Sequence, residues 1–236
     1  MSTTTRQDNR SIPVAFIFDL DGTLLNTLDD IAGAVNRVLR QQGFPEHDSQ
    51  RYQTFVGDGA EMLIQRALPP AERHEKTIAF CLEAYLKDYG ANWDQNTTPY
   101  AGIPDMLDAI NRLGLKMAVF SNKPHVFTVK CVERFLSKWE FVMVVGSNGR
   151  FPKKPDPAGA LAIADWMQED PKQIVFMGDS ATDMQTAVNA AMFPLGAGWG
   201  FRPASELMQN GCRFLARDPR DVVEFLDSNP AFCRPA

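Results

Sequence analysis

The sequence predicts an α/β fold in which a Rossmann-like, mostly parallel sheet carries an inserted α-helical module. Three observations predict this fold. Short apolar runs alternate with helical patterns, which indicates crossover connections and a parallel sheet. Most residues within the runs are apolar, as in strands that are covered on both faces. Residues 26–96 contain only helical patterns, and a length of 236 residues allows one large domain or one domain with an insert.

Six apolar runs are the candidate strands of the core. The first covers residues 14–18 and leads into the turn that begins at Asp19. The other five cover residues 116–120, 141–145, 174–177, 193–197 and 213–216. Apolar residues at helical spacing over 103–113, 126–136 and 160–167 separate several of these runs. Together these elements predict a core domain made of residues 1–25 and 97–236.

Three amphipathic helices make up the predicted cap domain, residues 26–96. Apolar residues recur at helical spacing over residues 28–39, 60–68 and 78–89. Segments that contain Gly or Pro separate the three patterns. A crossover unit needs only about 30 residues. The interval between the first and second strands is much longer, so it has room for a separate module.

Composition and charge exclude several classes of protein. Charged residues make up 22% of the chain and the net charge is −5, so neither intrinsic disorder nor a basic nucleic-acid-binding surface is expected. No apolar run is long enough to span a membrane. Residues 1–11 are polar, lack the apolar segment of a signal peptide and are expected to form a flexible extension. The four widely spaced cysteines form no metal or disulfide motif. We therefore expect a cytoplasmic protein without nucleic-acid or membrane partners.

The sharpest motif is Asp-Leu-Asp-Gly-Thr at the end of the first candidate strand. Side chains two residues apart in a strand point to the same face, so the carboxylates of Asp19 and Asp21 emerge together. They do so at the edge where open parallel sheets bind ligands. Two carboxylates this close repel each other unless a cation is present, and Mg²⁺ prefers oxygen ligands. A calcium loop does not fit, because Gly22 is the fourth residue of the motif and not the sixth.

Two further motifs carry groups that suit an anion. Ser121 and Asn122 follow the strand 116–120, where a hydroxyl, an amide and the N–H groups of a helix start could hold a phosphate. An ordinary helix cap is the alternative. Lys154 directly precedes Pro155, which restricts its position, and it could neutralise a nucleophilic carboxylate and a phosphate together. A solvated loop lysine is the alternative there.

Another pair of carboxylates follows the strand 174–177. Asp179 stands at the tip of this strand and Asp183 lies one helical turn later, so both can face one ion. The alternative is an N-cap aspartate followed by an acid that the helix dipole favours. In the cap, the turn from Gly57 to Gly59 opens a helix whose free N–H groups could bind a carboxylate of a substrate. A flexible hinge without ligand contacts is the alternative for that turn.

The four motifs together resemble those of the haloacid dehalogenase (HAD) superfamily of phosphohydrolases. DLDGTL, FSN, the Lys before Pro and GDSATD match the four motifs of that superfamily in order and spacing. The helical insert resembles the cap that the superfamily places between motifs one and two. The segments FVGDGA, SNKP, KKPDP and WGFR resemble its phosphoglycolate phosphatase branch. Asn26 stands where that branch commonly has Asp, and the two residues are equally good N-caps.

The resemblance implies a mechanism. Asp19 would be the nucleophile that forms an aspartyl-phosphate, and Asp21 would be the general acid and then the base. Mg²⁺ would bind Asp19, the backbone carbonyl of Asp21 and Asp179, with Asp183 as a ligand or next to one. The candidate residues are catalytic Asp19, Asp21 and Lys154; substrate-binding Ser121, Asn122, Lys154, Gly57 and Gly59; and metal-binding Asp19, Asp21, Asp179 and Asp183.

The expected function is hydrolysis of a small phosphomonoester, with 2-phosphoglycolate as the first candidate. Alternatives with related chemistry are a phosphatase of a sugar phosphate, a nucleotide or pyrophosphate, and a phosphosugar mutase. A binding protein without turnover is disfavoured, because both carboxylates of the first motif are intact. The expected partner is a small phosphorylated metabolite, and a homodimer is left open. Arg66, Lys123 and Arg202 are further candidate contacts for an anion, each with a solvated surface charge as its alternative.

Overall fold

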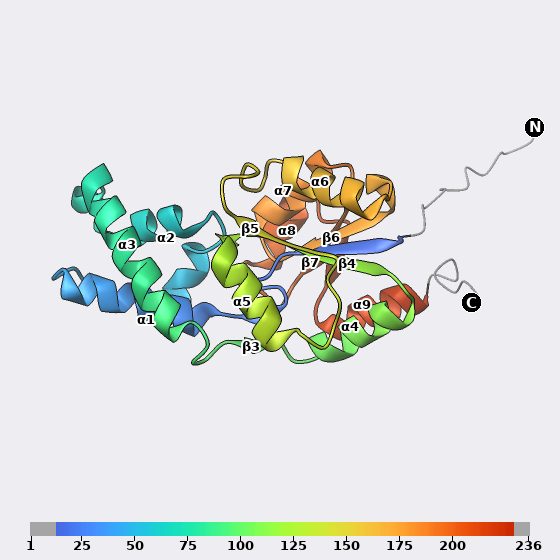
Figure 1. Ribbon diagram of the computed structural model, residues 1–236, viewed down its shortest axis with the longest axis horizontal. Helices are drawn as coiled ribbons and strands as arrows, with labels where there is room; N and C mark the ends of the chain where they lie inside the picture. Colours follow the sequence, from blue (N-terminus) through green and yellow to red (C-terminus); the bar gives the residue numbers. More distant parts are fainter. Residues whose placement is uncertain (1–12, 229–236) are drawn as a thin grey trace, which may run out of the picture.

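A six-stranded parallel sheet forms the centre of the computed structural model, which describes residues 13–228 (Figure 1). The predicted flexible extension, residues 1–11, lies outside this range. The strand order is β5-β4-β1-β6-β7-β8, so the first strand of the chain lies in the middle of the sheet. The strands are β1 (Ala15–Phe18), β4 (Lys116–Pro124), β5 (Met143–Ser147), β6 (Ile174–Gly178), β7 (Phe193–Ala197) and β8 (Phe214–Ala216).

Helices cover both faces of the sheet, which explains why its central strands are apolar at successive positions. Phe16 and Phe18 of β1 pack with α4 (Ile103–Arg112), α5 (His125–Phe135) and α9 (Pro219–Asp227). Ala15 and Ile17 point to the opposite face and pack with α6 (Ala158–Met167) and α7 (Ala181–Asn189). All four side chains are fully buried. The predicted α/β class with a parallel sheet is confirmed.

A short antiparallel ribbon that the sequence did not predict connects the sheet to the helical module. Its strands are β2 (Leu25–Asn26) and β3 (Thr98–Pro99). Two-residue strands have no periodicity that a sequence pattern could reveal. Strand β4 is also longer than predicted and extends to Pro124, which brings Ser121 and Asn122 into the strand itself.

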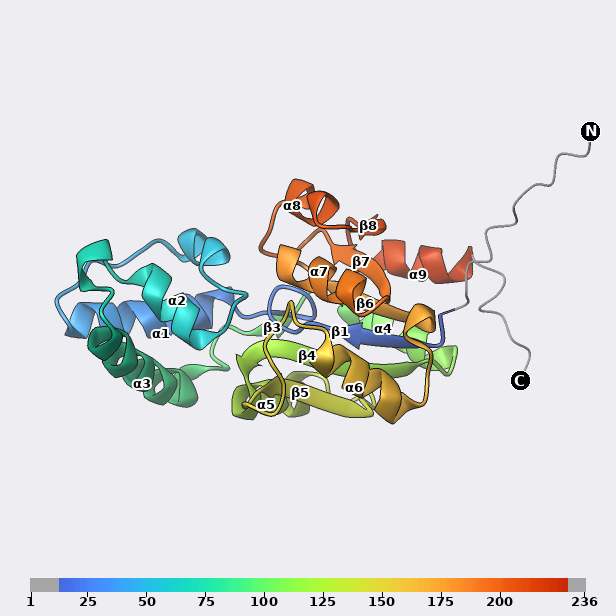
Figure 2. The same ribbon diagram turned by 90° about the horizontal axis from the view of Figure 1, so that it is seen from above.

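The helical module lies at one end of the molecule, as both views of the ribbon show (Figures 1 and 2). It contains α1 (Leu28–Gln41), α2 (Ala60–Ala67) and α3 (Glu75–Asn92) together with two short 3₁₀ turns, η1 (Ser49–Thr54) and η2 (Pro70–Glu72). These helices share their own apolar core, to which Phe127 and Phe201 of the sheet domain also contribute. Two more short elements, η3 (Pro171–Gln173) and α8 (Ala204–Gln209), belong to the sheet domain. Within residues 13–228, none of the helices has the length and apolar character needed to cross a bilayer.

Asp30 forms hydrogen bonds between the start of α1 and the segment that leads back to the sheet. This carboxylate is only 3% exposed and accepts hydrogen bonds from the backbone N–H of Asn96, at 2.9 and 3.0 Å, and of Thr97, at 2.9 Å. The side chains of Asn96 and Thr97 donate to it as well, at 2.8 and 2.7 Å. The start of α1 and the segment that leads back to the sheet are therefore fixed to each other at one point.

Candidate active site

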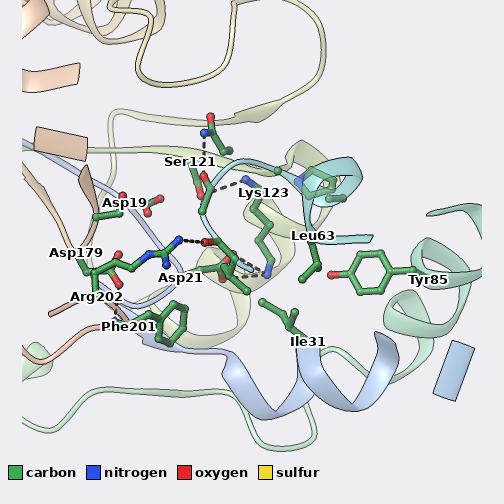
Figure 3. A pocket seen from close by; sticks show the side chains of 17 residues that line it. Asp19, Asp21, Ile31, Leu63, Tyr85, Ser121, Lys123, Asp179, Phe201 and Arg202 are labelled. Carbon is green, nitrogen blue, oxygen red and sulfur yellow. Dashed lines mark hydrogen bonds and ion pairs between the residues drawn. The ribbon is translucent and has the colours of Figure 1, made fainter. Parts of the chain in front are cut away.

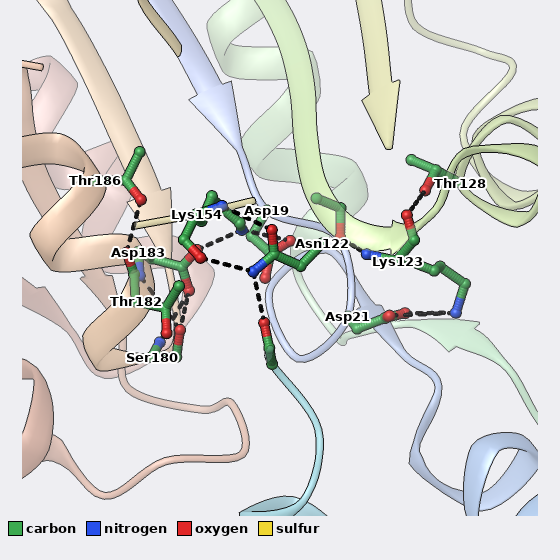
Figure 4. A network of polar contacts seen from close by, with 12 residues as sticks. Asp19, Asp21, Asn122, Lys123, Thr128, Lys154, Ser180, Thr182, Asp183 and Thr186 are labelled. Carbon is green, nitrogen blue, oxygen red and sulfur yellow. Dashed lines mark hydrogen bonds and ion pairs between the residues drawn. The ribbon is translucent and has the colours of Figure 1, made fainter. Parts of the chain in front are cut away.

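The predicted catalytic and metal-binding residues lie at the carboxyl edge of four neighbouring strands, and Figure 4 shows Asp19, Lys154 and Asp183 among them. Asp19 follows β1, Asp179 follows β6, Ser121 lies in the last part of β4, and Lys154 lies in the segment after β5. Parallel strands have their carboxyl ends at the same edge, and β1 lies between β4 and β6. Four segments that are far apart in the chain are therefore brought together.

Lys154 is a buried cation between two carboxylates. Its Nζ lies 2.6 Å from Oδ1 of Asp183 and 3.0 Å from Oδ1 of Asp19, and the residue is 3% exposed. Burial alone would lower the pKa of Lys154, but the charges of Asp183 and Asp19 outweigh it and raise the pKa above its usual value. The lysine is therefore charged and fixed, and the alternative of a solvated loop lysine is excluded.

Asp183 has a second role at the start of α7. Ser180 is the N-cap of this helix, and its hydroxyl accepts a hydrogen bond from the backbone N–H of Asp183. In return, Oδ2 of Asp183 accepts from the backbone N–H of Ser180, at 3.1 Å, and from its hydroxyl, at 2.6 Å. This capping box leaves Oδ1 for Lys154. The N-cap is thus Ser180, and not Asp179 as the alternative interpretation had it.

Asp179 is enclosed by backbone from two loops. Its Oδ2 accepts a hydrogen bond of 2.7 Å from the N–H of Phe201, and the residue is 3% exposed. A Cβ atom placed on Gly22 or on Gly200 would come within 2.2 Å of an Asp179 side-chain atom, so only glycine fits at either position. Burial, followed by the charges of Asp183 and Asp19, raises the pKa of Asp179 well above its usual value.

Three carboxylates form a group that suits a divalent cation. One oxygen from each of Asp19, Asp179 and Asp183 lies within 4.8 Å of the others, and all three residues are buried. Oδ1 of Asp19 forms an ion pair with Lys154 but has no well-aligned hydrogen bond within the described chain. Three carboxyl groups face one cation, Lys154, in this group. The donor set and the charge therefore both fit an ion such as Mg²⁺.

The side chain of Asp21 belongs to a separate ion pair. Lys123 Nζ lies 3.0 and 3.2 Å from its two oxygens, and the hydroxyl of Thr27 donates to Oδ1 at 2.8 Å. Lys123 also donates to the hydroxyl of Tyr89, on helix α3, at 2.7 Å. Lys123 is thus neither a solvated charge nor free, and it connects Asp21 with the helical module. A role for the Asp21 backbone carbonyl in metal binding stays a prediction.

The side-chain amide of Asn122 connects Lys154 with the helical module. Its Oδ1 accepts from the N–H of Lys154 at 2.9 Å, and its Nδ2 donates to the carbonyl of Lys154 at 3.1 Å. The same Nδ2 donates to the carbonyl of Gly57, in the helical module, at 3.0 Å. The side chain therefore fixes Lys154 and contacts the cap, a role that the sequence reasoning missed. Ser121 is buried beside it, and its Oγ accepts from the N–H of Lys123 at 3.3 Å.

Most of these groups line a cleft between the sheet edge and the helical module (Figure 3), but Lys154 and Asp183 are not among its lining residues. Gly57 and Gly59 line the cleft together with Ala60, the first residue of α2. The module also contributes side chains that the sequence reasoning assigned to its core or left out: Ile31, Val56, Leu63 and Tyr85. The sheet domain contributes Asp19, Asp21, Ser121, Asn122, Lys123, Pro124, Asp179, Ser180, Phe201 and Arg202.

Two contacts outside the cleft floor hold the module against the sheet domain. Arg202 Nη2 donates to the backbone carbonyl of Val56 at 3.0 Å, and the hydroxyl of Thr182 donates to Asp58 at 3.1 Å. Asp58 also pairs with Arg66. Arg66, a candidate anion contact, is not among the residues that line the cleft, whereas Arg202 is.

Comparison with known protein families agrees with this geometry. Residues 16–197 match the family model described as haloacid dehalogenase-like hydrolase. The matched segment includes β1 and the motif residues from Asp19 to Asp183. It therefore covers the candidate motif residues, whereas Phe201 and Arg202 of the cleft lie beyond it.

Individual relatives fit the same family. A phosphoglycolate phosphatase of Pseudomonas putida is 31% identical over 199 residues, which cover 81% of this chain and 71% of the relative. One of Psychrobacter arcticus is 31% identical over 216 residues, or 89% of this chain and 94% of the relative. The crystal structure of a predicted phosphoglycolate phosphatase from Haemophilus somnus has a TM-score of 0.82 at 26% identity, with 90% and 97% of the two chains covered. This chain therefore belongs to the haloacid dehalogenase-like hydrolases, in their phosphoglycolate phosphatase-like branch, and is a phosphoric monoester hydrolase.

Proposed function

We propose that the chain is a Mg²⁺-dependent phosphatase that hydrolyses a small phosphomonoester, 2-phosphoglycolate in the first place, through an aspartyl-phosphate on Asp19. One observation carries the proposal. Asp19, buried and with an oxygen that lacks a hydrogen bond, faces the fixed cation Lys154, while Asp21 lies two residues away in a different ion pair. Neighbouring carboxylates with different partners suit the separate roles of nucleophile and acid–base group.

Asp19 attacks the phosphorus atom, the bond from phosphorus to the leaving oxygen breaks, and the phosphoryl group is carried on the carboxylate. Asp21 gives a proton to the leaving oxygen and then takes one from the water that hydrolyses the aspartyl-phosphate. Lys154 and Ser121, together with the backbone of Asn122, hold the phosphoryl oxygens. Catalysis in this scheme consists mainly of positioning and charge stabilisation.

The carboxylates of Asp19 and Asp179 are the residues that we assign to Mg²⁺, together with the backbone carbonyl of Asp21. Asp183 is held by Lys154 and Ser180, so we assign it to support of the metal group. When bound, the ion neutralises negative charge on the phosphoryl group and the carboxylates. The excess of carboxylates over cations in this group supports the assignment.

The names of the relatives and the lining of the cleft support a small, acidic substrate. Both bacterial relatives described above carry the name phosphoglycolate phosphatase. Ile31, Val56 and Leu63 line the cap side of the cleft and offer no hydrogen bonds to the hydroxyl groups of a sugar. Arg202 and Lys123 add positive charge. Cytoplasm is the compartment that we propose, because Cys81, Cys131 and Cys212 are buried free thiols.

Phosphate release tests this proposal. The purified protein should release phosphate from 2-phosphoglycolate with Mg²⁺ and lose this activity in excess EDTA. The value of kcat/KM should be lower for glucose 6-phosphate, AMP and pyrophosphate. Asp19→Asn should fold and be inactive. No release from any substrate by folded protein would refute the proposal, and interconversion of sugar phosphates without net release would favour a mutase.

A further inference from the structure

Tyr85 places a hydroxyl in the cleft that none of the interactions described so far uses. The residue lies on α3, is 4% exposed and lines the cleft. In Figure 3 its hydroxyl points past Leu63 and Ile31 toward the side of the cleft where Lys123 and Asp21 lie. Within residues 13–228 the hydroxyl has no hydrogen-bond partner. The hydroxyl opens to the cleft, where it is available to a ligand or to water.

The neighbouring tyrosine fixes the direction of this hydroxyl. Tyr85 and Tyr89 lie one helical turn apart on α3, and their rings stack with centroids 5.5 Å apart and planes 24° apart. Tyr89 accepts the hydrogen bond from Lys123. The two side chains therefore extend from the cap toward the same part of the sheet edge. Burial raises the pKa of Tyr85 above its usual value, so its hydroxyl remains protonated and can donate at neutral pH.

Lys123 and the start of α2 line the same cleft. An ammonium group has three N–H donors. Those of Lys123 Nζ contact the two oxygens of Asp21 and the hydroxyl of Tyr89, so Lys123 contributes its positive charge to the cleft and no free donor. Helix α2 begins at Ala60 without a side-chain cap, and its first intrahelical hydrogen bond comes from Leu63. Ala60 itself lines the cleft, and its N–H group precedes this first intrahelical hydrogen bond.

A carboxylate accepts hydrogen bonds from hydroxyl and backbone N–H groups, and the charged Lys123 lines the same cleft. We propose that Tyr85, Lys123 and the start of α2 form a subsite for a carboxylate on the leaving group, and that Tyr85 determines specificity for it. The proposal rests on the proposed phosphatase function and names the part of the substrate that the cap binds. The apolar side chains of Ile31 and Leu63 beside Tyr85 offer no acceptors to the O–H groups of a neutral polyol.

The test compares two substrates that differ in this carboxylate. We would measure kcat and KM of wild type and Tyr85→Phe with 2-phosphoglycolate and with ethyl phosphate, whose leaving group has no acid. Loss of one hydrogen bond to a charged group should lower kcat/KM for 2-phosphoglycolate about tenfold or more, mainly through KM. The value for ethyl phosphate should not change. Tyr52→Phe is the matched control, because Tyr52 is buried in the same module but donates to Asn36.

The outcomes separate this proposal from the proposed function. A wild-type protein that releases phosphate from neither substrate refutes the phosphatase assignment and the subsite with it. An active wild type whose Tyr85→Phe variant loses nothing, or loses equally on both substrates, overturns the subsite alone. Circular dichroism checks that the variant is folded. If it is not, wild type with 2-phosphoglycolamide decides: a KM close to that of 2-phosphoglycolate would overturn the proposal, and a KM about tenfold higher would support it.

Discussion

Replacement of Lys154 by methionine tests how the charges of the site are balanced. The substitution keeps most of the length of the side chain and removes its charge. Lys154 is 3% exposed and its Nζ is 2.6 Å from Asp183 and 3.0 Å from Asp19, so Lys154→Met leaves a group of three buried carboxylates without this cation. Methionine cannot donate a hydrogen bond to either carboxylate.

The loss of stability in the metal-free variant should be large. Removal of one partner from a buried ion pair lowers the free energy of unfolding by roughly 3–5 kcal/mol, since the remaining charge is buried without compensation. Lys116→Met is the matched control. Lys116 pairs with Glu169, but its side chain is 42% exposed, and an exposed pair of this kind contributes at most about 1 kcal/mol. Mg²⁺ should restore part of the loss in Lys154→Met, because it supplies positive charge to the same carboxylates.

Urea denaturation, monitored by circular dichroism with EDTA and with Mg²⁺, measures the loss of stability and the part of it that Mg²⁺ restores. Lys154→Met should unfold at a clearly lower urea concentration than wild type or Lys116→Met in EDTA, and the gap should narrow with Mg²⁺. Phosphate release should be lost in Lys154→Met under both conditions. Equal midpoints for Lys154→Met and wild type in EDTA would show that the ion group does not contribute to stability as the geometry implies.

Three further predictions concern the metal group, the contact between the cap and the sheet domain, and the connecting segments. Burial and the neighbouring carboxylates raise the pKa of Asp179, so the free energy of unfolding without metal should fall as the pH rises from about 4 through the folded pKa. Mg²⁺ should weaken this dependence on pH. A metal-free protein whose free energy of unfolding does not fall over this pH range would contradict the prediction. Arg202→Ala removes the contact with Val56 and should raise KM about fivefold, unlike the exposed control Arg220→Ala. Asp30→Asn should lower the free energy of unfolding by about 2 kcal/mol; an unchanged midpoint would refute this.

The sequence was informative where one strand determines the geometry. The apolar run at residues 14–18 predicted β1, and the motif after it predicted that Asp19 and Asp21 share one end of the strand. What the sequence could not show is the partner of each carboxylate. Lys123 stood as a candidate anion contact, and only the pairing of β1 with β4 brings it next to Asp21. Such contacts depend on strand order, which local patterns do not contain.

The cap was the less predictable part of the site. Its three helices follow from their apolar periodicity, but periodicity does not distinguish a core residue from one at the edge of a cleft. Tyr85 fits the apolar stripe of α3, although its hydroxyl faces the cleft. The one sequence signal for this position of Tyr85 was a second tyrosine, Tyr89, one turn later in an otherwise apolar stripe. The side-chain bond from Asn122 to Gly57 depends on how the two parts pack and has no sequence pattern.

Trapping of the phosphorylated enzyme tests the central claim most directly. With p-nitrophenyl phosphate the leaving group needs no proton, so Asp21→Asn should still transfer the phosphoryl group to Asp19 but should fail to activate water. After an acid quench, fragment-ion mass spectrometry should find the phosphoryl group on Asp19 in Asp21→Asn with Mg²⁺, and none in Asp19→Asn. A phosphoryl group on another residue, or none on Asp19 while wild type turns the substrate over, would contradict the account.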